Sequence, residues 1–152
     1  MPNKLDSKKL TVHTDGGSRG NPGPSAIGVV IKNADGNLLK KYGEFLGIKT
    51  NNEAEYEAVI FALKKVKALF GKKAVKKTQI NIKMDSELVV KQLNGEYKIE
   101  EERLFPCFIK IWNLKMDFGK VEFQHIPREQ NKEADELANE ILDEKENKQV
   151  LF

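Results

Sequence analysis

The chain contains few of the residues that build disulfides or zinc sites. One of its 152 residues is a cysteine, Cys107, and two are histidines, His13 and His125. A single cysteine excludes an internal disulfide, and three sulfur or imidazole side chains supply a zinc site poorly. Any bound metal must therefore be held mainly by carboxylate oxygens, which suit hard ions such as magnesium or manganese.

Long apolar runs are also absent. No run approaches the roughly 20 residues that cross a bilayer, and the segment from Met1 to Asp6 has no apolar signal-peptide core. We therefore expect a cytoplasmic protein without membrane contact. The length fits a single domain over residues 1–152, with an N-terminal extension of about 1–9 and a C-terminal tail of about 144–152.

Excess charge of one sign is small, because the formal net charge is +3. This value alone does not indicate a nucleic-acid-binding protein. Lysines nevertheless gather in one stretch of the chain, at Lys64, Lys65, Lys67, Lys72, Lys73, Lys76 and Lys77. Such a run is either a solvated face or a surface for sequence-independent contact with phosphates, and the sequence leaves both interpretations open.

Hydrophobic periodicity predicts five strands and four helices. The strands are expected at residues 10–15, 26–32, 38–45, 79–84 and 121–126. The helices are expected at residues 51–70, 86–94, 106–116 and 131–146. Three strands in hairpin order, followed by helices that alternate with two more strands, predict an α/β fold with a sheet that is partly antiparallel and partly parallel.

Local signals add details to these elements. We expect Asn51 or Asn52 to cap the helix at 51–70, and Gly71 to end it. Trp112 and Cys107 lie in apolar surroundings, so both are expected in the core, Trp112 in preference to a role as a base-stacking surface.

Acidic residues follow two of the predicted strands. Asp15 is expected to end the first strand, directly before a glycine-rich turn, and Asp85 ends the fourth, directly before a helix. The carboxyl ends of strands in open α/β sheets are where ligands gather. Asp85 could instead only cap the helix that follows it.

Two further acids lie on helices. Helical spacing places Glu55 on the same face as Ala58 and Val59, which should be buried. Asp135 lies in the first turn of the last helix, beside that helix's apolar stripe. Glu55 could alternatively reach solvent along its stem, and Asp135 could only complement the helix dipole.

Four converging carboxylates would repel one another and resist desolvation unless cations neutralise them. Such a cluster can hold two Mg²⁺ ions about 4 Å apart, with Mn²⁺ as a substitute. One ion would activate a water and the other would stabilise the leaving 3′-oxygen. This is the logic of phosphodiester hydrolysis without a covalent intermediate.

The segments that carry these acids resemble four blocks of the ribonuclease H type 1 family, in the same order along the chain. The blocks are Thr14 to Pro24, Thr50 to Glu55, Asp85 with Ser86, and Asn131 to Ala138. The match covers nearly the whole chain, and each block supplies one of the four acids Asp15, Glu55, Asp85 and Asp135. One block alone would be weak evidence, but four in order form a specific signal.

The resemblance implies a ribonuclease H-like fold, with a five-stranded mixed sheet of three antiparallel and two parallel strands flanked by helices. It implies an endoribonuclease that hydrolyses the RNA strand of RNA–DNA hybrids, with Asp15, Glu55, Asp85 and Asp135 as catalytic metal ligands. It also implies contacts with the substrate at eight positions, namely Gly16, Gly17, Ser18, Asn21, Thr50, Asn51, Asn52 and Ser86. Amide side chains suit a 2′-hydroxyl, which both donates and accepts hydrogen bonds.

The chain departs from the family at two places. Many members carry a flexible histidine before the last acid. Here His125 alternates with Val121 and Phe123 along a predicted strand, so we expect it to be packed. We assign the role of that histidine to Arg128 instead, and Glu129 could also reach the metal ions. A basic, tryptophan-rich insertion found in some members is replaced by the short, largely acidic stretch 96–103.

The alternatives are a nuclease of the same fold that cleaves double-stranded RNA and a catalytically silent nucleic-acid-binding module. Such silent modules usually lose an acid, and none is missing here. We expect the protein to act as a monomer. The apolar end from Gln149 to Phe152 either packs on the domain or contacts a partner protein such as a sliding clamp.

Overall fold

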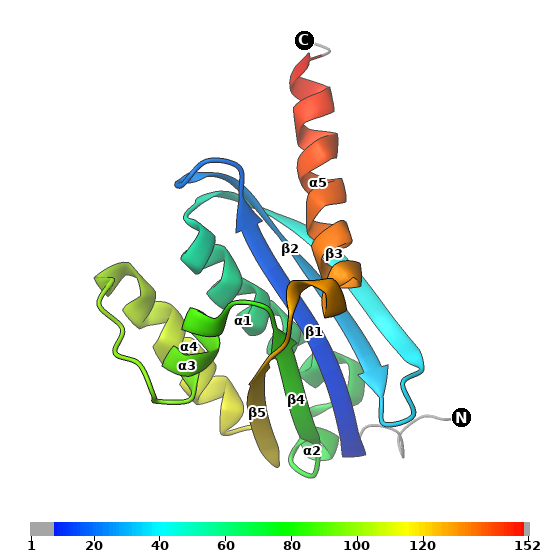
Figure 1. Cartoon of the computed structure of the whole chain (residues 1–152). Coiled ribbons are helices and arrows are strands. Elements are labelled where there is room, and N and C mark those ends of the chain that lie inside the picture. Colours follow the sequence, from blue (N-terminus) through cyan, green and yellow to red (C-terminus); the bar gives the residue numbers. More distant parts are fainter. Residues whose placement is uncertain (1–7, 151–152) are drawn as a thin grey trace.

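The computed structural model describes residues 8–150, and their side chains through residue 148. Figure 1 shows a twisted sheet with α1 behind it and α5 in front of it. The elements are β1 (Lys9–Ser18), β2 (Gly23–Asn33), β3 (Leu38–Lys49), α1 (Asn51–Phe70), α2 (Lys72–Val75), β4 (Gln79–Met84), α3 (Glu87–Leu93), η2 (Glu102–Leu104), α4 (Phe105–Lys115), β5 (Lys120–His125), η3 (Arg128–Gln130) and α5 (Lys132–Val150).

The strands form one sheet in the order β3-β2-β1-β4-β5. β1, β2 and β3 pair antiparallel, whereas β4 pairs parallel with both β1 and β5. The hairpin between β2 and β3 is closed by Asn33, whose side-chain oxygen accepts from the backbone N–H groups of Asp35 and Asn37. This architecture confirms the predicted mixed sheet of three antiparallel and two parallel strands.

Helices cover both faces of the sheet. Ile27, Val29 and Ile31 of β2 belong to the large core that includes α1, while Ala26 packs with Ala138 of α5. Successive residues of a strand point to opposite faces, so α1 and α5 lie on opposite sides of β2. Gly28 permits the close approach of α5, because a Cβ there would collide with the carbonyl of Ala134.

The N-terminus of α1 differs from the prediction in its capping residue. Thr50, rather than Asn51 or Asn52, is the N-cap: its side chain accepts from the N–H of Glu53, and the Glu53 carboxylate accepts from the N–H of Thr50. This reciprocal pair is a capping box. Gly71 ends the helix as predicted, with a φ of 90°.

The prediction that Trp112 lies in the core is wrong. α4 packs on α1 through Ile111, whereas Trp112 points outward and is 55% exposed. An eleven-residue helix that covers one face of α1 buries only one stripe of its own surface, and Trp112 falls on the other stripe. Cys107 is half-buried, so it is only partly the core residue that was expected.

The chain ends also differ from the expected boundaries. β1 begins at Lys9, inside the expected N-terminal extension, and α5 continues to Val150 through most of the expected tail. The side chains from Gln149 to Phe152 lie outside the described part, so the expected partner contact there stays a prediction. Within residues 8–150, no helix combines the length and the apolar character that crossing a membrane requires.

Candidate active site

Asp15 and Asp85 lie where the parallel part of the sheet ends. β1 does not end at Asp15, as was predicted, but continues to Ser18 because it still pairs with β2. Its parallel pairing with β4 stops at His13, two residues before Asp15, and Asp85 directly follows Met84 at the end of β4. The two carboxylates therefore share the carboxyl edge of adjacent parallel strands, as ligand-binding residues of α/β sheets commonly do.

Glu55 reaches the same edge from α1. Its side chain is buried, as its helical position predicted, and Oε1 accepts a hydrogen bond from the N–H of Gly16 at 3.0 Å. The helix lies against the strand here, since a Cβ on Gly16 would collide with the Ala54 carbonyl. Gly16 thus permits the close approach of α1 that brings Glu55 to the sheet.

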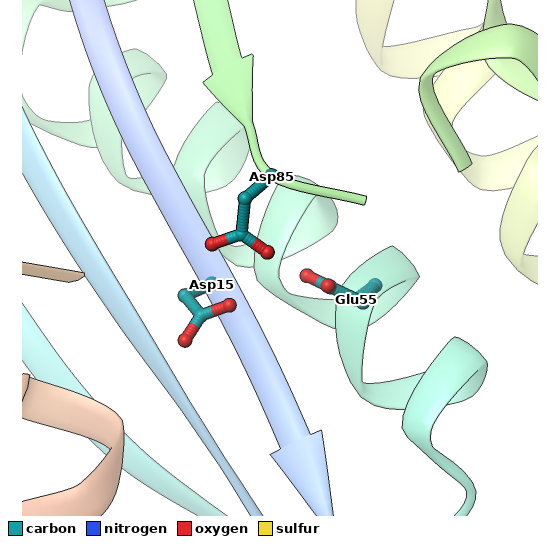
Figure 2. A group of neighbouring side chains, drawn as sticks. All are labelled: Asp15, Glu55 and Asp85. Carbon is teal, nitrogen blue, oxygen red and sulfur yellow. The ribbon is translucent and has the colours of Figure 1, made fainter. Parts of the chain in front are cut away.

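Asp15, Glu55 and Asp85 form a compact carboxylate cluster. Each offers one oxygen, and these three oxygens lie within 4.8 Å of one another. Figure 2 shows the three side chains pointing toward one another from β1, α1 and the end of β4. Asp15 and Glu55 are each only 8% exposed.

The electrostatics of this cluster are unfavourable without a cation. Burial, followed by the charge of Asp85 and the adjacent Asp135, raises the pKa of Asp15 to about 8. Burial, followed by the charges of Asp15 and Asp85, raises the pKa of Glu55 well above its usual range, although the Gly16 N–H opposes this shift. Because the donors are all carboxylate oxygens, the cluster fits a hard divalent cation that would relieve both burial and repulsion.

Asp135 stands beside this cluster and outside its most compact part. It lies in the first turn of α5, is close enough to Asp15 to contribute to the raised pKa of that carboxyl, and is partly exposed. The guanidinium of Arg128 approaches it at 3.8 Å. Three of the four predicted acids therefore form the compact cluster, and the fourth flanks them on the side of α5.

Asn131 is a structural residue of this site that sequence reasoning did not single out. It is 1% exposed, and its Nδ2 donates to the Thr14 carbonyl at 2.9 Å and to Asp85 Oδ2 at 3.0 Å. Its own carbonyl accepts from the N–H of Asp135. One side chain thus ties β1, Asp85 and the start of α5 together. Its place four residues before Asp135 was the available signal.

Comparisons with known proteins agree with this geometry. The family model described as "Reverse transcriptase-like" matches residues 13–141. The crystal structure of LC11-RNase H1, a protein from a compost metagenome, in complex with an RNA/DNA hybrid is 48% identical over 86% of this chain and 94% of that one, with a TM-score of 0.82. RNase H1 from Halobacterium salinarum is 39% identical, over 90% of this chain and 98% of the solved chain, with a TM-score of 0.82.

The chain belongs to the ribonuclease H type 1 family.

Some curated members of the family are longer than this chain. The match spans 65% of the length of the Halobacterium salinarum ribonuclease HI, at 39% identity. It spans 36% of a bifunctional protein from Mycobacterium tuberculosis, at 35% identity. The shared part in each case covers about nine-tenths of this chain.

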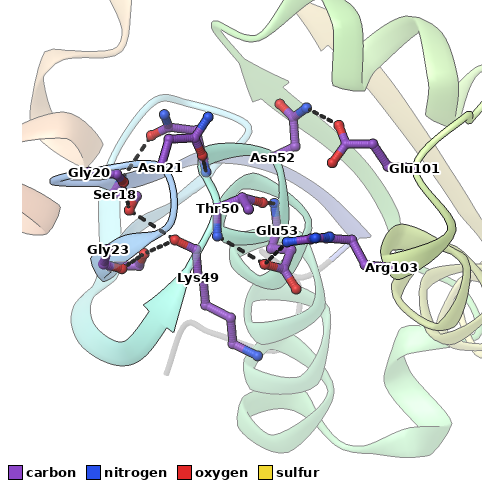
Figure 3. Close-up of polar contacts among 12 residues, drawn as sticks. Ser18, Gly20, Asn21, Gly23, Lys49, Thr50, Asn52, Glu53, Glu101 and Arg103 are labelled. Atoms are coloured by element: carbon purple, nitrogen blue, oxygen red, sulfur yellow. Dashed lines mark hydrogen bonds and ion pairs between the residues drawn. The ribbon is translucent and has the colours of Figure 1, made fainter.

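The polar positions that the ribonuclease H resemblance pointed to form a network between the glycine-rich turn and α1 (Figure 3). The Ser18 N–H donates to Asn51 Oδ1 at 2.9 Å, and the Asn51 N–H donates to Asn21 Oδ1 at 2.9 Å. The Ser18 hydroxyl lies within hydrogen-bond distance of the carbonyl oxygens of Gly20 and Lys49, to either of which it can donate its one proton. Asn21 and Asn51 are exposed, and within residues 8–150 the structure shows no partner for either amide nitrogen.

Other positions of this set have structural partners of their own. Thr50 and Ser86 are N-caps of α1 and α3, and Asn52 Nδ2 donates to Glu101 at 2.8 Å. The Gly16 N–H is already used by Glu55, whereas a Cβ on Gly17 would meet no described atom within 4 Å. Of these two glycines, Gly17 is therefore the one whose backbone is open to the approach of another molecule.

The prediction that His125 is packed is wrong. It is the last residue of β5, opposite Met84, and its side chain is exposed because the strand forms the edge of the sheet. Arg128 follows in η3, and 78% of its side chain is exposed. Both side chains are therefore accessible, but the structure records a contact with one of the four acids only for Arg128.

The lysine-rich stretch lies far from the carboxylates. It covers the end of α1 and all of α2, which leads into the amino end of β4, whereas Asp85 follows the carboxyl end of the same strand. The six residues of β4 span about 20 Å at the usual rise per residue. Figure 1 shows α2 at the opposite end of β4 from α3. These lysines therefore do not line the candidate site.

Proposed function

We propose that this domain is an endoribonuclease that hydrolyses the RNA strand of RNA–DNA hybrids and leaves 5′-phosphomonoesters. One observation carries the proposal: carboxylates from β1, α1 and the residue after β4 converge within 4.8 Å at the carboxyl edge of the sheet, and two of the three are buried. Membership of the ribonuclease H type 1 family supports it, as does the 48% identity to a protein solved with an RNA/DNA hybrid.

The metal site belongs to the proposal. Asp15, Glu55, Asp85 and Asp135 would hold two Mg²⁺ ions, with Mn²⁺ as a substitute. Bound divalent cations supply Lewis-acid stabilisation of the charge that develops on phosphoryl oxygens. The protein fixes the ligands in advance: the Gly16 N–H orients Glu55, and Asn131 orients Asp85. Such supporting hydrogen bonds keep ligating carboxylates in one geometry.

Recognition of the hybrid is assigned to the turn and the start of α1. Asn21 and Asn51 are exposed, and their amide nitrogens, which have no partner among the described residues, are free to donate hydrogen bonds to a substrate. Gly17, two residues after Asp15, leaves room for a sugar-phosphate backbone. Gly16, Ser18, Thr50, Asn52 and Ser86 would act mainly by holding this surface in shape. A 2′-hydroxyl is the group that distinguishes RNA from DNA at such a surface.

Arg128 is proposed as an accessory catalytic residue. Its exposed guanidinium lies 3.8 Å from Asp135, so it can approach a phosphate held at the carboxylates and favour product release by competing for Asp135. One chain carries all of these residues, so the catalytic unit is a monomer.

Cleavage of matched labelled duplexes tests the function. RNA–DNA, RNA–RNA and DNA–DNA duplexes of one sequence are incubated with Mg²⁺, with Mn²⁺ and with EDTA. We expect metal-dependent cleavage confined to the RNA strand of the hybrid, with the phosphate on the 5′ end of the downstream product. Equal cleavage of RNA–RNA would instead establish the broader nuclease, and binding without cleavage would establish the silent module.

A matched pair of variants excludes a contaminating nuclease from this assay. Asp85→Asn removes a carboxylate from the cluster, whereas Asp35→Asn makes the same change on the exposed hairpin between β2 and β3. Cleavage should disappear only with Asp85→Asn. Equal activity of the two variants would reject the site assignment.

A further inference from the structure

The outer face of α4 carries a stripe of exposed apolar side chains. Phe105 is 44% exposed, Ile109 57%, Trp112 55% and Met116, which directly follows the helix, 72%. Their spacing of four, three and four residues is the a/d pattern with which one helix packs along another. We call these four residues the α4 stripe. Figure 1 places α4 on the outer side of the molecule, on the flank away from α5.

An apolar hollow adjoins the amino end of the stripe. Tyr97, Ile99 and Phe108 line it together with Phe105 and Ile109. The hollow and the stripe form a continuous apolar surface, and contiguous surfaces of this kind on soluble proteins commonly mark interaction sites.

The stripe is symmetric about its own centre. Phe105 and Met116 are equally far from the midpoint of the four residues, and so are Ile109 and Trp112. Against an antiparallel copy of the same helix, Phe105 of one copy faces Met116 of the other, and Ile109 faces Trp112. The larger side chains at the carboxyl end can then enter the hollow of the other copy. Such self-complementarity is the requirement for a two-fold interface.

Charge along α4 favours the same orientation. Glu100 and Glu102 are exposed just before the amino end, and Lys115 lies at the carboxyl end. Among the charges of opposite sign, Arg103 approaches Glu53 at 3.9 Å and Asp117 pairs with Lys67 at 2.8 Å. Lys98 is exposed near the amino end, where acidic side chains still predominate. Antiparallel pairing brings the acidic end of one copy to the basic end of the other, and parallel pairing would bring like charges together.

We infer that the α4 stripe is the seam of a two-fold homodimer in which the α4 helices of two copies pack antiparallel. Four half-exposed large side chains offer on the order of 400 Å² per copy, which lies at the low end of specific interfaces. The dimer is therefore weak and forms at high protein concentration. The inference is independent of the proposed function, since each copy keeps its own carboxylate cluster.

Sedimentation equilibrium of the full chain over a range of concentrations tests the inference. The wild type should show a monomer–dimer equilibrium. Trp112→Glu should weaken dimerisation at least about thirtyfold, as the loss of a central aromatic anchor does. Leu69→Glu is the matched control, because Leu69 is 44% exposed on α1, outside the stripe, and it should leave the equilibrium unchanged. Far-UV circular dichroism verifies that each variant is folded.

A charge reversal tests the orientation. Lys115→Glu should weaken the dimer about tenfold, because two-fold symmetry counts each rim contact twice. Combining it with Glu100→Lys and Glu102→Lys should restore wild-type association. Two results would overturn the antiparallel arrangement. Lys115→Glu could dimerise as strongly as the wild type, or the triple variant could fail to regain wild-type association.

Two further outcomes would overturn the inference entirely. If the wild type sediments as a monomer at every concentration, as Trp112→Glu is expected to do, then the dimer does not exist. If Trp112→Glu instead lowers the affinity for hybrid at protein concentrations where the wild type is monomeric, the stripe is a nucleic-acid contact. Cleavage rates per chain at low protein concentration should be equal for the wild type and Trp112→Glu.

Discussion

Two regions of this molecule depart from the usual burial pattern in opposite directions. At the carboxyl edge of β1 and β4 the protein buries acids, with Asp15 and Glu55 each 8% exposed, whereas on α4 it exposes Trp112 at 55%. Buried acids resist desolvation and repel one another, and exposed apolar groups are poorly hydrated. Both arrangements cost free energy in the isolated chain, and at each place a binding partner would recover that cost.

The partners expected at the two regions differ because the physical costs differ. A cation relieves charge repulsion, and its effect depends on pH. A second apolar surface removes hydrophobic area from water, and its effect depends on protein concentration. Changing one region should therefore leave the properties of the other unaltered.

The largest effect is expected from Asp15→Asn. Removing a metal ligand should lower the rate of hybrid cleavage at least about 10³-fold, or about 4 kcal/mol in the activation free energy. The same change removes a buried charge, so the metal-free variant should unfold at a higher temperature than the wild type at pH 8. Rate measurements and thermal denaturation in EDTA test both statements. Cleavage at the wild-type rate would contradict the assignment.

The pH dependence of stability follows from the raised pKa of Asp15. This carboxyl titrates near pH 4 when unfolded and at about 8 when folded. The folded state therefore holds the proton more tightly, and the free energy of unfolding of the metal-free protein falls as pH rises from about 4 to about 8. The change between pH 5 and pH 8 should be about 2–4 kcal/mol.

Addition of Mg²⁺ should reverse this loss, because the cation replaces the protons. Thermal denaturation with Mg²⁺ and with EDTA, at pH 5 and at pH 8, measures the effect. We expect the larger gain in Tm at pH 8. An equal gain at both pH values would show that the buried acids are not the site of binding.

Asn131→Ala tests the scaffold of the carboxylate cluster. It removes the hydrogen bonds to Thr14 and Asp85, which should lower the free energy of unfolding by about 1–3 kcal/mol. The Mg²⁺ concentration needed for half-maximal activity should rise about 10- to 100-fold, as with other residues that support metal ligands. Asn139→Ala, on the helix α5 that directly follows Asn131, is the control. A stability loss without a change in Mg²⁺ dependence would limit Asn131 to a packing role.

A smaller effect is expected from Arg128→Ala. Loss of the guanidinium beside Asp135 should lower the cleavage rate about tenfold, or about 1.4 kcal/mol. Arg128→Lys should retain part of the activity because it keeps the charge, and His125→Ala should stay within about twofold of the wild type. A greater loss with His125→Ala would transfer the role to the histidine.

The smallest effect is expected from Trp112→Gln. The side chain is mostly exposed, with Lys115 stacked over its ring at 5.3 Å, so the free energy of unfolding should change by less than about 1 kcal/mol. Cleavage should be unchanged at low protein concentration. Chemical denaturation and the duplex assay measure the two quantities. A loss of several kcal/mol would show that Trp112 is a core residue after all.

The sequence by itself determined the order and type of the main elements and the identity of the acids. β4 occupies the predicted residues, and α1 begins and ends where the pattern placed it. Glu55 was recognisable because a charged residue on an apolar helix face violates the expected pattern. Such signals are local, since they depend on spacing along a single element and on the cost of burying a charge.

Only the tertiary structure decided how these elements meet. Trp112 and His125 were both expected to be packed, and both are exposed, because no described element covers the outer face of α4 or the free edge of β5. Asn131 gained its role from contacts 46 and 117 residues away. Burial and hydrogen bonding depend on neighbours from distant parts of the chain, and periodicity along one segment carries no information about which neighbours those are.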